Sequence, residues 1–451
     1  MENTAVDINL LSNMRETFEK LENLMAIDLQ DQPPEVIDSK KYAWKMFLEL
    51  KPELTAKLEG WRYTDPAKFL AKISMSSERT KLSLALKAVS LDGFYGITST
   101  NGVDFGFQEF SKSADLKPLI ANFSDLFQKE APVRLRELIA KHFTARNYSQ
   151  ADALFALNAA LAKDTLLIYV TPEMGEVKIK IDHLLSTLSD KMVNSRVFLI
   201  LEDQARATII EEYNSQNSFN YFLNGAIEVF VGQNAKFNYT RILLGDETAT
   251  HYARVIINAS QDACVKFDQI NLGFNTVRNE ILFNLNGKNF DGHLNGLTIA
   301  DGDQHVDNFT EIDNRAPNCF SRELFKGVYA GRAKGAFCGS IIVRREGQKT
   351  NAVQSNQTIL LSETAEINSK PQLKIWADDV KCTHGATVGK LNEEALFYSR
   401  SRGIDLETSR KILLMAFVGE VISQIEDPSI RSYVSELVNI TIGKKIASSF
   451  S

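Results

Sequence analysis

The sequence predicts a mostly β protein with a helical region at each end. Short β-rich runs recur about every ten residues between about residues 165 and 388, and asparagine, glycine and aspartate separate them. Helical periodicity dominates the residues before this segment, and helix signals return after it. We therefore expect three regions, which comprise residues 1–164, 165–389 and 390–451.

Apolar residues at helical spacing predict the helices of the first region. Six of them would form one face of an amphipathic first helix: Ile8, Leu11, Met14, Phe18, Leu21 and Met25. The consecutive prolines Pro33 and Pro34 would end this helix. We expect a second helix over roughly Ser39 to Leu50, and further helix within about Leu116 to Ala162.

Strand-like runs fill the central region, and they include residues 195–201, 207–213, 236–244, 251–258, 264–272, 280–286 and 339–345. More than two hundred residues of short strands fit a sandwich, a barrel or a solenoid. The lack of a sharp sequence repeat weakens the solenoid. The length of the region favours it, because a single sandwich usually needs about 100 residues.

Capping residues define the helices of the third region. The N-cap candidates are Asn392, Asp405 and the pair Asp427-Pro428, in which proline would occupy the first helical position. Glutamates follow Asn392 at once, and arginines precede Gly403. Acids first, bases last and glycine beyond is the order that a helix dipole and a left-handed cap favour.

Composition argues against several functional classes. With 51 basic and 57 acidic residues the formal net charge is −6, so no strong positive field would attract nucleic acid or a membrane surface. Apolar runs such as residues 412–419 are too short to span a bilayer, and we expect no signal peptide. The cysteines lack CxxC spacing, which fits a reducing, cytoplasmic location: Cys264, Cys319, Cys338 and Cys382.

Enzyme motifs are missing from the sequence. It contains no P-loop, no GxSxG and no HExxH. A β-helical carbohydrate-active enzyme stays open as an alternative, and it would need two carboxylates beside a groove. The dense acidic candidates are Asp301, Asp303, Asp307 and Glu311.

Cys382 and His384 form the candidate metal site. They lie two residues apart in a strand-like run, so they would project from the same face. A closed iron–sulfur or zinc site usually needs four ligands, and a partner would have to supply the others. The alternative is a small buried cysteine beside a hydrogen-bonded structural histidine.

A long string around these residues resembles the SufD branch of the SufB/SufD family. The string is KPQLKIWADDVKCTHGATVGKLNEEALFYSRSRGI, and the resemblance extends to SRELFKGVYAGRAKGAFCGSIIV, QKTNAVQSNQTILLSETAEINSKPQL, DNFTEIDNRAP, EGWRYTDP and FALNAALAKD. SufB-type chains carry an EHEAT-like string where this chain has CTHGATVG. Asn314 is a departure, because many relatives would have histidine there.

The resemblance implies a right-handed parallel β-helix core flanked by N-terminal and C-terminal helical regions. It also implies a non-catalytic scaffold role in the SUF system of iron–sulfur cluster assembly. The partners would be a SufB-like subunit bound through the β-helix and a SufC-like ATPase, with a homodimer as a further possibility. The ATPase would supply nucleotide turnover, consistent with the missing P-loop.

Site residues follow from the resemblance as expectations. A transient iron–sulfur cluster would form only in the assembled complex, at the interface with the SufB-like subunit. Cys382 and His384 are the candidate ligands, and His384 is the stronger one. The expected contacts of the ATPase are Phe397, Tyr398, Arg400 and Arg402. Two alternatives stay open: a structural dimerisation protein without cluster chemistry, and C-terminal helices that only cap an open β-helix.

Overall fold

The computed structural model describes residues 34–50, 59–66, 91–100, 104–109, 119–122, 152–185, 191–215 and 220–449, with residues 19, 23, 69, 135 and 137–139. Almost all of the predicted first helix, Ile8 to Met25, lies outside these residues.

Strands make up most of the described chain. They are β1 (Tyr95–Thr100), β2 (Asp104–Glu109), β3 (Leu119–Asn122), β4 (Leu166–Val170), β5 (Glu176–Leu185), β6 (Lys191–Leu201), β7 (Arg206–Ser215), β8 (Tyr221–Val231), β9 (Lys236–Leu244), β10 (Thr250–Ala259), β11 (Cys264–Asn271), β12 (Thr276–Leu285), β13 (Asp291–Ala300), β14 (His305–Asn314), β15 (Phe320–Tyr329), β16 (Lys334–Val343), β17 (Asn351–Leu360), β18 (Glu366–Ile375) and β19 (Lys381–Gly389).

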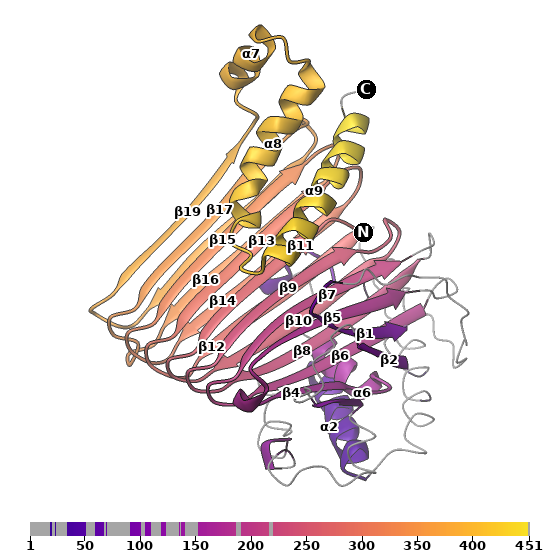
Figure 1. The fold of residues 1–451 in the computed structure, drawn as a ribbon, viewed down its shortest axis with the longest axis vertical. Helices are drawn as coiled ribbons and strands as arrows, with labels where there is room; N and C mark the ends of the chain where they lie inside the picture. Colours follow the sequence, from indigo (N-terminus) through magenta and orange to yellow (C-terminus); the bar gives the residue numbers. More distant parts are fainter. Residues whose placement is uncertain are drawn as a thin grey trace, which may run out of the picture.

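These strands form two sheets that wind into a parallel β-helix (Figure 1). One sheet has the order β19-β17-β15-β13-β11-β9-β7-β5-β1-β2, and the other has the order β18-β16-β14-β12-β10-β8-β6-β4-β3. Consecutive strands from β5 to β19 alternate between the sheets, so the chain makes about seven turns. The predicted parallel β-helix is confirmed, and the sandwich and barrel alternatives are excluded.

Variable turn lengths explain the weak sequence repeat. Thr250 pairs with Thr276 on the next turn, whereas Lys334 pairs with the more distant Glu366. Backbone pairing between turns is kept while the sequence interval changes, so no fixed period appears in the sequence.

The two ends of the β-helix differ. At the N-terminal end, β2 pairs antiparallel with β1, and β3 pairs antiparallel with β4. The helix expected within Leu116 to Ala162 is therefore wrong for Leu119–Asn122, which is a strand. At the C-terminal end, β18 and β19 are the last strands of their sheets, and no described strand pairs with their outer edges.

Helices of the N-terminal region cover the outer face of the sheet that contains β8. They are α2 (Pro34–Leu50), η2 (Glu59–Trp61) and α6 (Ala153–Leu161), and a further short helix, η4 (Pro172–Met174), follows β4. All of α6 is buried, and its apolar side chains pack with those of α2, β8 and β10. The second predicted helix is confirmed, although it begins at Pro34, a residue well suited to the first helical position.

The C-terminal region forms α7 (Glu393–Ser401), α8 (Leu406–Ile422) and α9 (Pro428–Ser449). Asn392 Oδ1 accepts the Ala395 N–H at 2.9 Å, and Asp405 Oδ1 accepts the Thr408 N–H at 2.9 Å. Asp427 caps α9 in the same way, so all three predicted N-caps are confirmed. Among the described helices, none is both long and apolar enough to cross a membrane.

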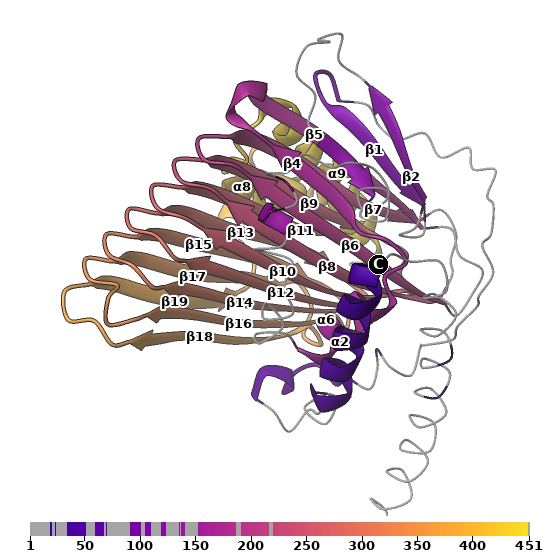
Figure 2. The same cartoon turned by 90° about the horizontal axis from the view of Figure 1, so that it is seen from below.

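Helices α8 and α9 cover the outer face of the other sheet (Figures 1 and 2). Leu414, Val418 and Val434 belong to one buried apolar cluster with Ile270 and Leu297 of that sheet. Both helices contact β13, which is several strands away from the edge at β19. They therefore cover a face and do not cap the open end.

Inward-facing residues stack in columns because each turn is in register with the next. One column runs through Ile179, Ile209, Tyr239, Phe267, Leu294, Glu323, Gln354 and His384. We call it the His384 column. Its side chains as far as Leu294 lie in the main apolar core, and its last three residues are polar.

Glu323 is the buried carboxyl of this column. Thr310 Oγ1 donates to its Oε1 at 2.5 Å, and Gln354 Nε2 donates to its Oε2 at 2.6 Å. Both partners are neutral groups. Burial raises the pKa of the Glu323 carboxyl from 4.5 to about 7, although the two hydrogen bonds oppose this shift.

Glu323→Gln should change how stability depends on pH. The folded carboxyl holds its proton more tightly than the unfolded one, so the free energy of unfolding should fall as the pH rises from about 4.5 to about 7. Relative to the variant, the wild type should lose about 3 kcal/mol over this window, as measured by denaturant unfolding at each pH. Glu363→Gln, in an exposed turn, is the matched control. Parallel pH curves for wild type and Glu323→Gln would contradict the prediction.

A candidate metal site at the open end of the β-helix

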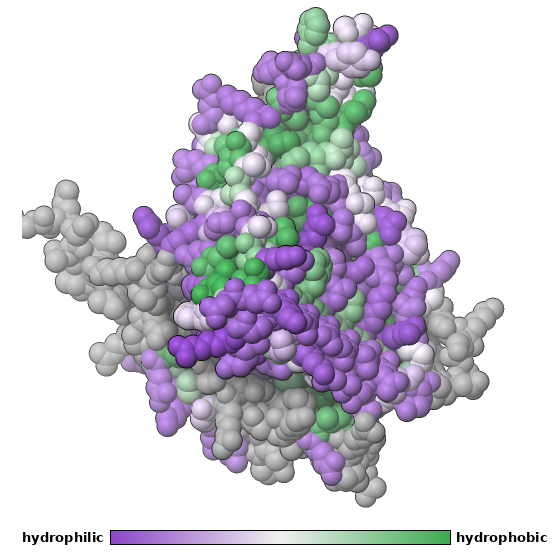
Figure 3. Space-filling view, turned by 90° about the vertical axis from the view of Figure 1, so that its left-hand side faces the viewer, coloured by the Kyte–Doolittle hydropathy of each residue, from purple (hydrophilic) through white to green (hydrophobic). Residues whose placement is uncertain are grey.

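Cys382 and His384 lie on β19, the edge strand of the open end. They are the cross-strand neighbours of Ala352 and Gln354, two buried residues of β17. Their side chains therefore project between the two sheets, on one shared face, as strand alternation predicts. Cys382 is partly buried and His384 is exposed, because no further turn covers them. Figure 3 shows the side of the molecule that carries β19, where hydrophilic and hydrophobic residues are interspersed.

The surroundings of Cys382 are apolar. Its side chain packs against a small cluster that includes Ile341, Val343 and Ala352. Burial raises the pKa of the Cys382 thiol, and a hydrogen bond with the Ala352 backbone only partly opposes this effect. The thiol is therefore protonated at neutral pH, and a nearby cation or metal ion would be needed to stabilise the thiolate.

The chain offers no complete metal site among its described residues. No group of three or more histidine, cysteine, aspartate or glutamate side chains lies close enough there to hold a metal ion. Cys264 Sγ lies 4.0 Å from Asp291 Oδ2, and His293 Nε2 lies 3.3 Å from Asp291 Oδ1, on a different part of the sheet. Cys382 and His384 could thus supply two ligands of a metal site, and the remaining ligands would have to come from another chain.

Cations bind three of the four acids considered for a carbohydrate-active enzyme. Asp303 forms an exposed ion pair with Arg332, at 2.6 Å between Oδ2 and Nη2. Asp307 is buried and binds Arg278, again at 2.6 Å. Asp301 Oδ1 lies 3.8 Å from Lys445 Nζ. The fourth acid, Glu311, is on the outer face of β14. These ion pairs give Asp301, Asp303 and Asp307 structural roles.

Asn314, the departure from the family pattern, is fully buried on β14. Its Nδ2 donates to the main-chain oxygen of Ile342 at 3.1 Å. It is part of the interior of the β-helix and lies away from the edge strand β19.

Helix α7 presents the predicted contacts of the ATPase to solvent. None of its residues is buried, and the side chains of Phe397 and Tyr398 are 76% and 60% exposed. Arg402 lies over the Tyr398 ring, with its guanidinium carbon 5.2 Å from the ring centroid, and Arg400 is exposed. Near the top of Figure 3, where α7 and α8 lie, hydrophobic and hydrophilic residues occur together. Large exposed aromatic side chains on a helix are typical of a protein-binding surface.

A buried ionic cluster inside the β-helix was not predicted from the sequence. His183 Nε2 lies 2.8 Å from Glu211 Oε1, and Arg241 donates to His251 Nε2 at 2.7 Å. Burial and the Arg241 charge keep the pKa of His251 well below its usual range, so the ring accepts this hydrogen bond in its neutral form. His183 and Glu211 lie on neighbouring turns of one sheet, whereas Arg241 and His251 meet across the interior from consecutive strands of the two sheets.

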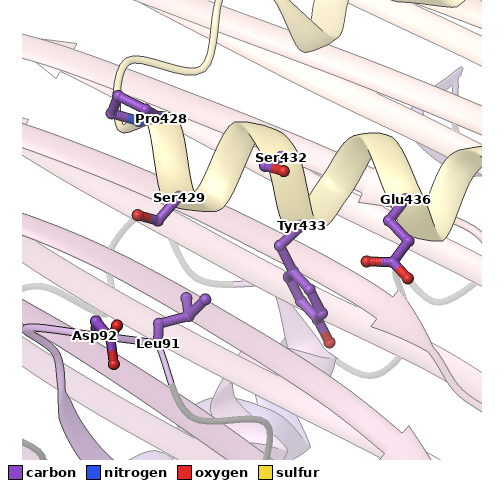
Figure 4. A pocket seen from close by; sticks show the side chains of 7 residues that line it. All are labelled: Leu91, Asp92, Pro428, Ser429, Ser432, Tyr433 and Glu436. Carbon is purple, nitrogen blue, oxygen red and sulfur yellow. The ribbon is translucent and has the colours of Figure 1, made fainter.

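A surface groove of about 540 Å³ lies between residues 91–92 and helix α9 (Figure 4). Asp92, Ser429, Ser432 and Glu436 line it, together with Tyr433, whose hydroxyl donates to Glu212 at 2.6 Å. Since Glu212 is on β7, the groove is many strands away from β19. It contains none of the predicted site residues.

Comparisons with known proteins agree with this architecture. The family described as SUF system FeS cluster assembly, SufBD core domain, matches residues 183–417, and the SufBD protein N-terminal region matches residues 122–181. The iron–sulfur cluster assembly protein SufD of Escherichia coli is 28% identical over 391 residues, which are 84% of this chain and 87% of the relative. SufD of Bacillus subtilis is 24% identical over 392 residues, which are 86% and 89% of the two chains. A SufBD family protein of Synechocystis is 28% identical over 402 residues, which are 84% and 86% of the two chains. Because the core-domain family alone matches more than half of the residues and the N-terminal region matches as well, the chain belongs to the SufBD family of iron–sulfur cluster assembly proteins.

Proposed function

We propose that this chain is a non-catalytic scaffold subunit that pairs through its open end with a SufB-like subunit. The observation that carries the proposal is the position of Cys382 and His384, which face inward on the last strand of an unpaired edge. A second β-helix stacked on β18 and β19 would satisfy the free backbone groups of both strands. It would also place its own side chains against the two donors.

The nascent iron–sulfur cluster is the cargo of this interface. Cysteine and histidine are established ligands of such clusters, and two donors from one chain leave the other positions to the partner. The raised pKa of the Cys382 thiol fits a site that becomes competent only when iron or a basic partner group arrives. The isolated chain would then hold no cluster of its own.

A SufC-like ATPase would bind at α7. This helix carries Phe397, Tyr398 and Arg400, with Arg402 as its C-cap, and none of its residues is buried although it contacts α8. The two proposed surfaces are separate, since one is a strand edge and the other a helix, but β19 leads directly into α7. Nucleotide turnover by the ATPase could in this way act on the interface through a short connection.

The cytoplasm is the proposed location of the complex. All four cysteines are free thiols, which a reducing compartment would preserve. A homodimer through the same edge is the alternative to pairing with the SufB-like subunit. Co-purification of this chain with and without the SufB-like and SufC-like proteins, followed by iron and sulfide analysis, separates these arrangements.

His384→Ala should lower the cluster content of the reconstituted complex by at least about tenfold, because even the loss of an outer-shell partner commonly weakens a metal site tenfold or more. The side chain is exposed and bonds nothing in the described structure, so folding and complex formation should not change. The measurement is iron and sulfide per complex together with the visible absorption spectrum.

Thr383→Ala is the matched control, because Thr383 is exposed on the opposite face of the same strand. Its complex should assemble clusters like the wild type. An unchanged cluster yield with His384→Ala would contradict the proposed role of this residue.

Substitution of Phe397 and Tyr398 by alanine should weaken co-purification of the SufC-like ATPase by tenfold or more, since exposed aromatic anchors commonly dominate such interfaces. Point variants test the role of α7 more specifically than truncation after Gly389. The truncation would also remove α8 and α9 and expose the apolar face of the sheet beneath them. Ile440→Ala, an exposed apolar residue of α9, serves as the control. Full ATPase binding by the double variant would contradict the assignment of α7.

A further inference from the structure

Gln354 has a buried hydrogen-bond acceptor that nothing in the described chain uses. Its side chain is 1% exposed, and its Oε1 has no partner there. A buried amide oxygen without a donor is unfavourable by roughly 1–3 kcal/mol, so a donor that reaches it would be stabilising. This oxygen lies one turn before the open end, so a donor from the last turn is the group that could reach it.

The orientation of the Gln354 amide is fixed by its neighbours. Its Nε2 donates to Glu323 Oε2 at 2.6 Å, while the other oxygen of Glu323 accepts from Thr310. Gly339 leaves the space for this arrangement, because a Cβ atom there would collide with Gln354 Nε2. With the nitrogen held toward the carboxyl group, Oε1 has to point elsewhere.

His384 is the next residue of the column beyond Gln354. The two are cross-strand neighbours on β17 and β19, and adjacent strands lie about 4.8 Å apart. Within the described structure the His384 ring makes no hydrogen bond, and its side chain is exposed. A neutral imidazole ring has one nitrogen that carries a hydrogen and one that does not. The first can donate to an amide oxygen, and the second can bind a metal ion.

We infer that Gln354 is a positioning residue for His384: when a partner covers the open end, its Oε1 accepts the N–H of the His384 ring. This inference rests on the proposed function, in which His384 is an interfacial ligand. The hydrogen bond fixes one tautomer and leaves the other ring nitrogen free for iron. Glu323, Thr310 and Gly339 hold the amide in place, so the support for the ligand extends two turns into the β-helix.

The physical basis for this role of Gln354 is the general behaviour of histidine ligands. A metal-binding histidine nearly always donates its second nitrogen to an oxygen acceptor, which sets the ring orientation and raises the basicity of the ligand. Removal of such an acceptor typically lowers metal affinity by about 10–100-fold. A glutamine anchored to a buried carboxyl suits this role, because it accepts a hydrogen bond without adding a charge beside the cluster.

The test uses the full chain assembled with its SufB-like and SufC-like partners. Gln354→Met keeps the length of the side chain and removes the acceptor. The double variant Glu323→Gln with Gln354→Glu exchanges the pair, so an amide N–H still donates to a carboxyl oxygen and the second carboxyl oxygen stays available to His384. Gln357→Met is the matched control, since Gln357 is a half-buried residue on the outer face of the same strand. Two quantities are measured: Co²⁺ affinity from the visible d–d bands of the cluster-free complex, and the His384 tautomer from ¹⁵N shifts of the ring nitrogens.

The expected results separate positioning from general stability. Gln354→Met should lower Co²⁺ affinity by about 10–100-fold and convert a single His384 tautomer into a mixture. The exchanged pair, Glu323→Gln with Gln354→Glu, should keep most of both, and Gln357→Met should match the wild type. If Gln354→Met fails to assemble, Gly339→Ala provides a second route, because its Cβ would displace the Gln354 amide and crowd Thr310 and Phe337 without replacing a polar group.

Failure of this inference can be told apart from failure of the proposed function. If His384→Ala lowers Co²⁺ affinity while Gln354→Met and Gly339→Ala behave like the wild type, the inference is wrong and the ligand role stands. If His384→Ala leaves Co²⁺ affinity and cluster yield unchanged, the proposed function fails at this site, and the inference fails with it.

Discussion

Backbone pairing between successive turns is the constraint on which the rest of this structure depends. Each turn lies in register with the one before it, so inward-facing side chains stack in continuous columns. Every interior residue then needs neighbours on both sides along the axis, and the last turn has them on one side only. The open end at β18 and β19 is a direct result, and strand edges of this kind are normally covered or used for binding.

The described helices α6, α8 and α9 cover the two outer faces, and none of these three covers the axial end at β18 and β19. On one face, α6 is wholly buried against the sheet that contains β8, and on the other, α8 and α9 cover the sheet that contains β13. These helices cover outward-facing apolar residues of both sheets, whereas the edge strand β19 and helix α7 stay exposed. This division gives each proposed partner a place of its own.

The change from apolar to polar residues along the His384 column links the interior to the open end. A buried carboxyl group at Glu323 and a buried amide at Gln354 weaken a core that leucine or phenylalanine would fill more favourably. Their hydrogen bonds to Thr310 and to each other reduce this penalty and fix their orientations. Polar groups placed on the path to a candidate ligand favour a functional reason for keeping them.

Local physical chemistry made some features predictable from the sequence. Helix caps depend on a few adjacent residues, so Asn392, Asp405 and Asp427 were placed correctly from the sequence. Strands with alternating β-branched and aromatic residues were also found. Strand β17 was harder, because polar side chains such as Gln354 and Asn356 occupy its inward positions and hide the usual alternation.

By itself, then, the sequence determined the β-rich core, the helical ends, the family resemblance and the shared face of Cys382 and His384, since all of these depend on neighbouring residues or on recognisable strings. Only the tertiary structure decided that these two side chains lie at an open end, and that Glu323 and Gln354 lead to His384 through the interior. The physical reason is that the register between turns follows from backbone pairing and varies with turn length. Residues about thirty positions apart become neighbours without leaving a fixed period in the sequence.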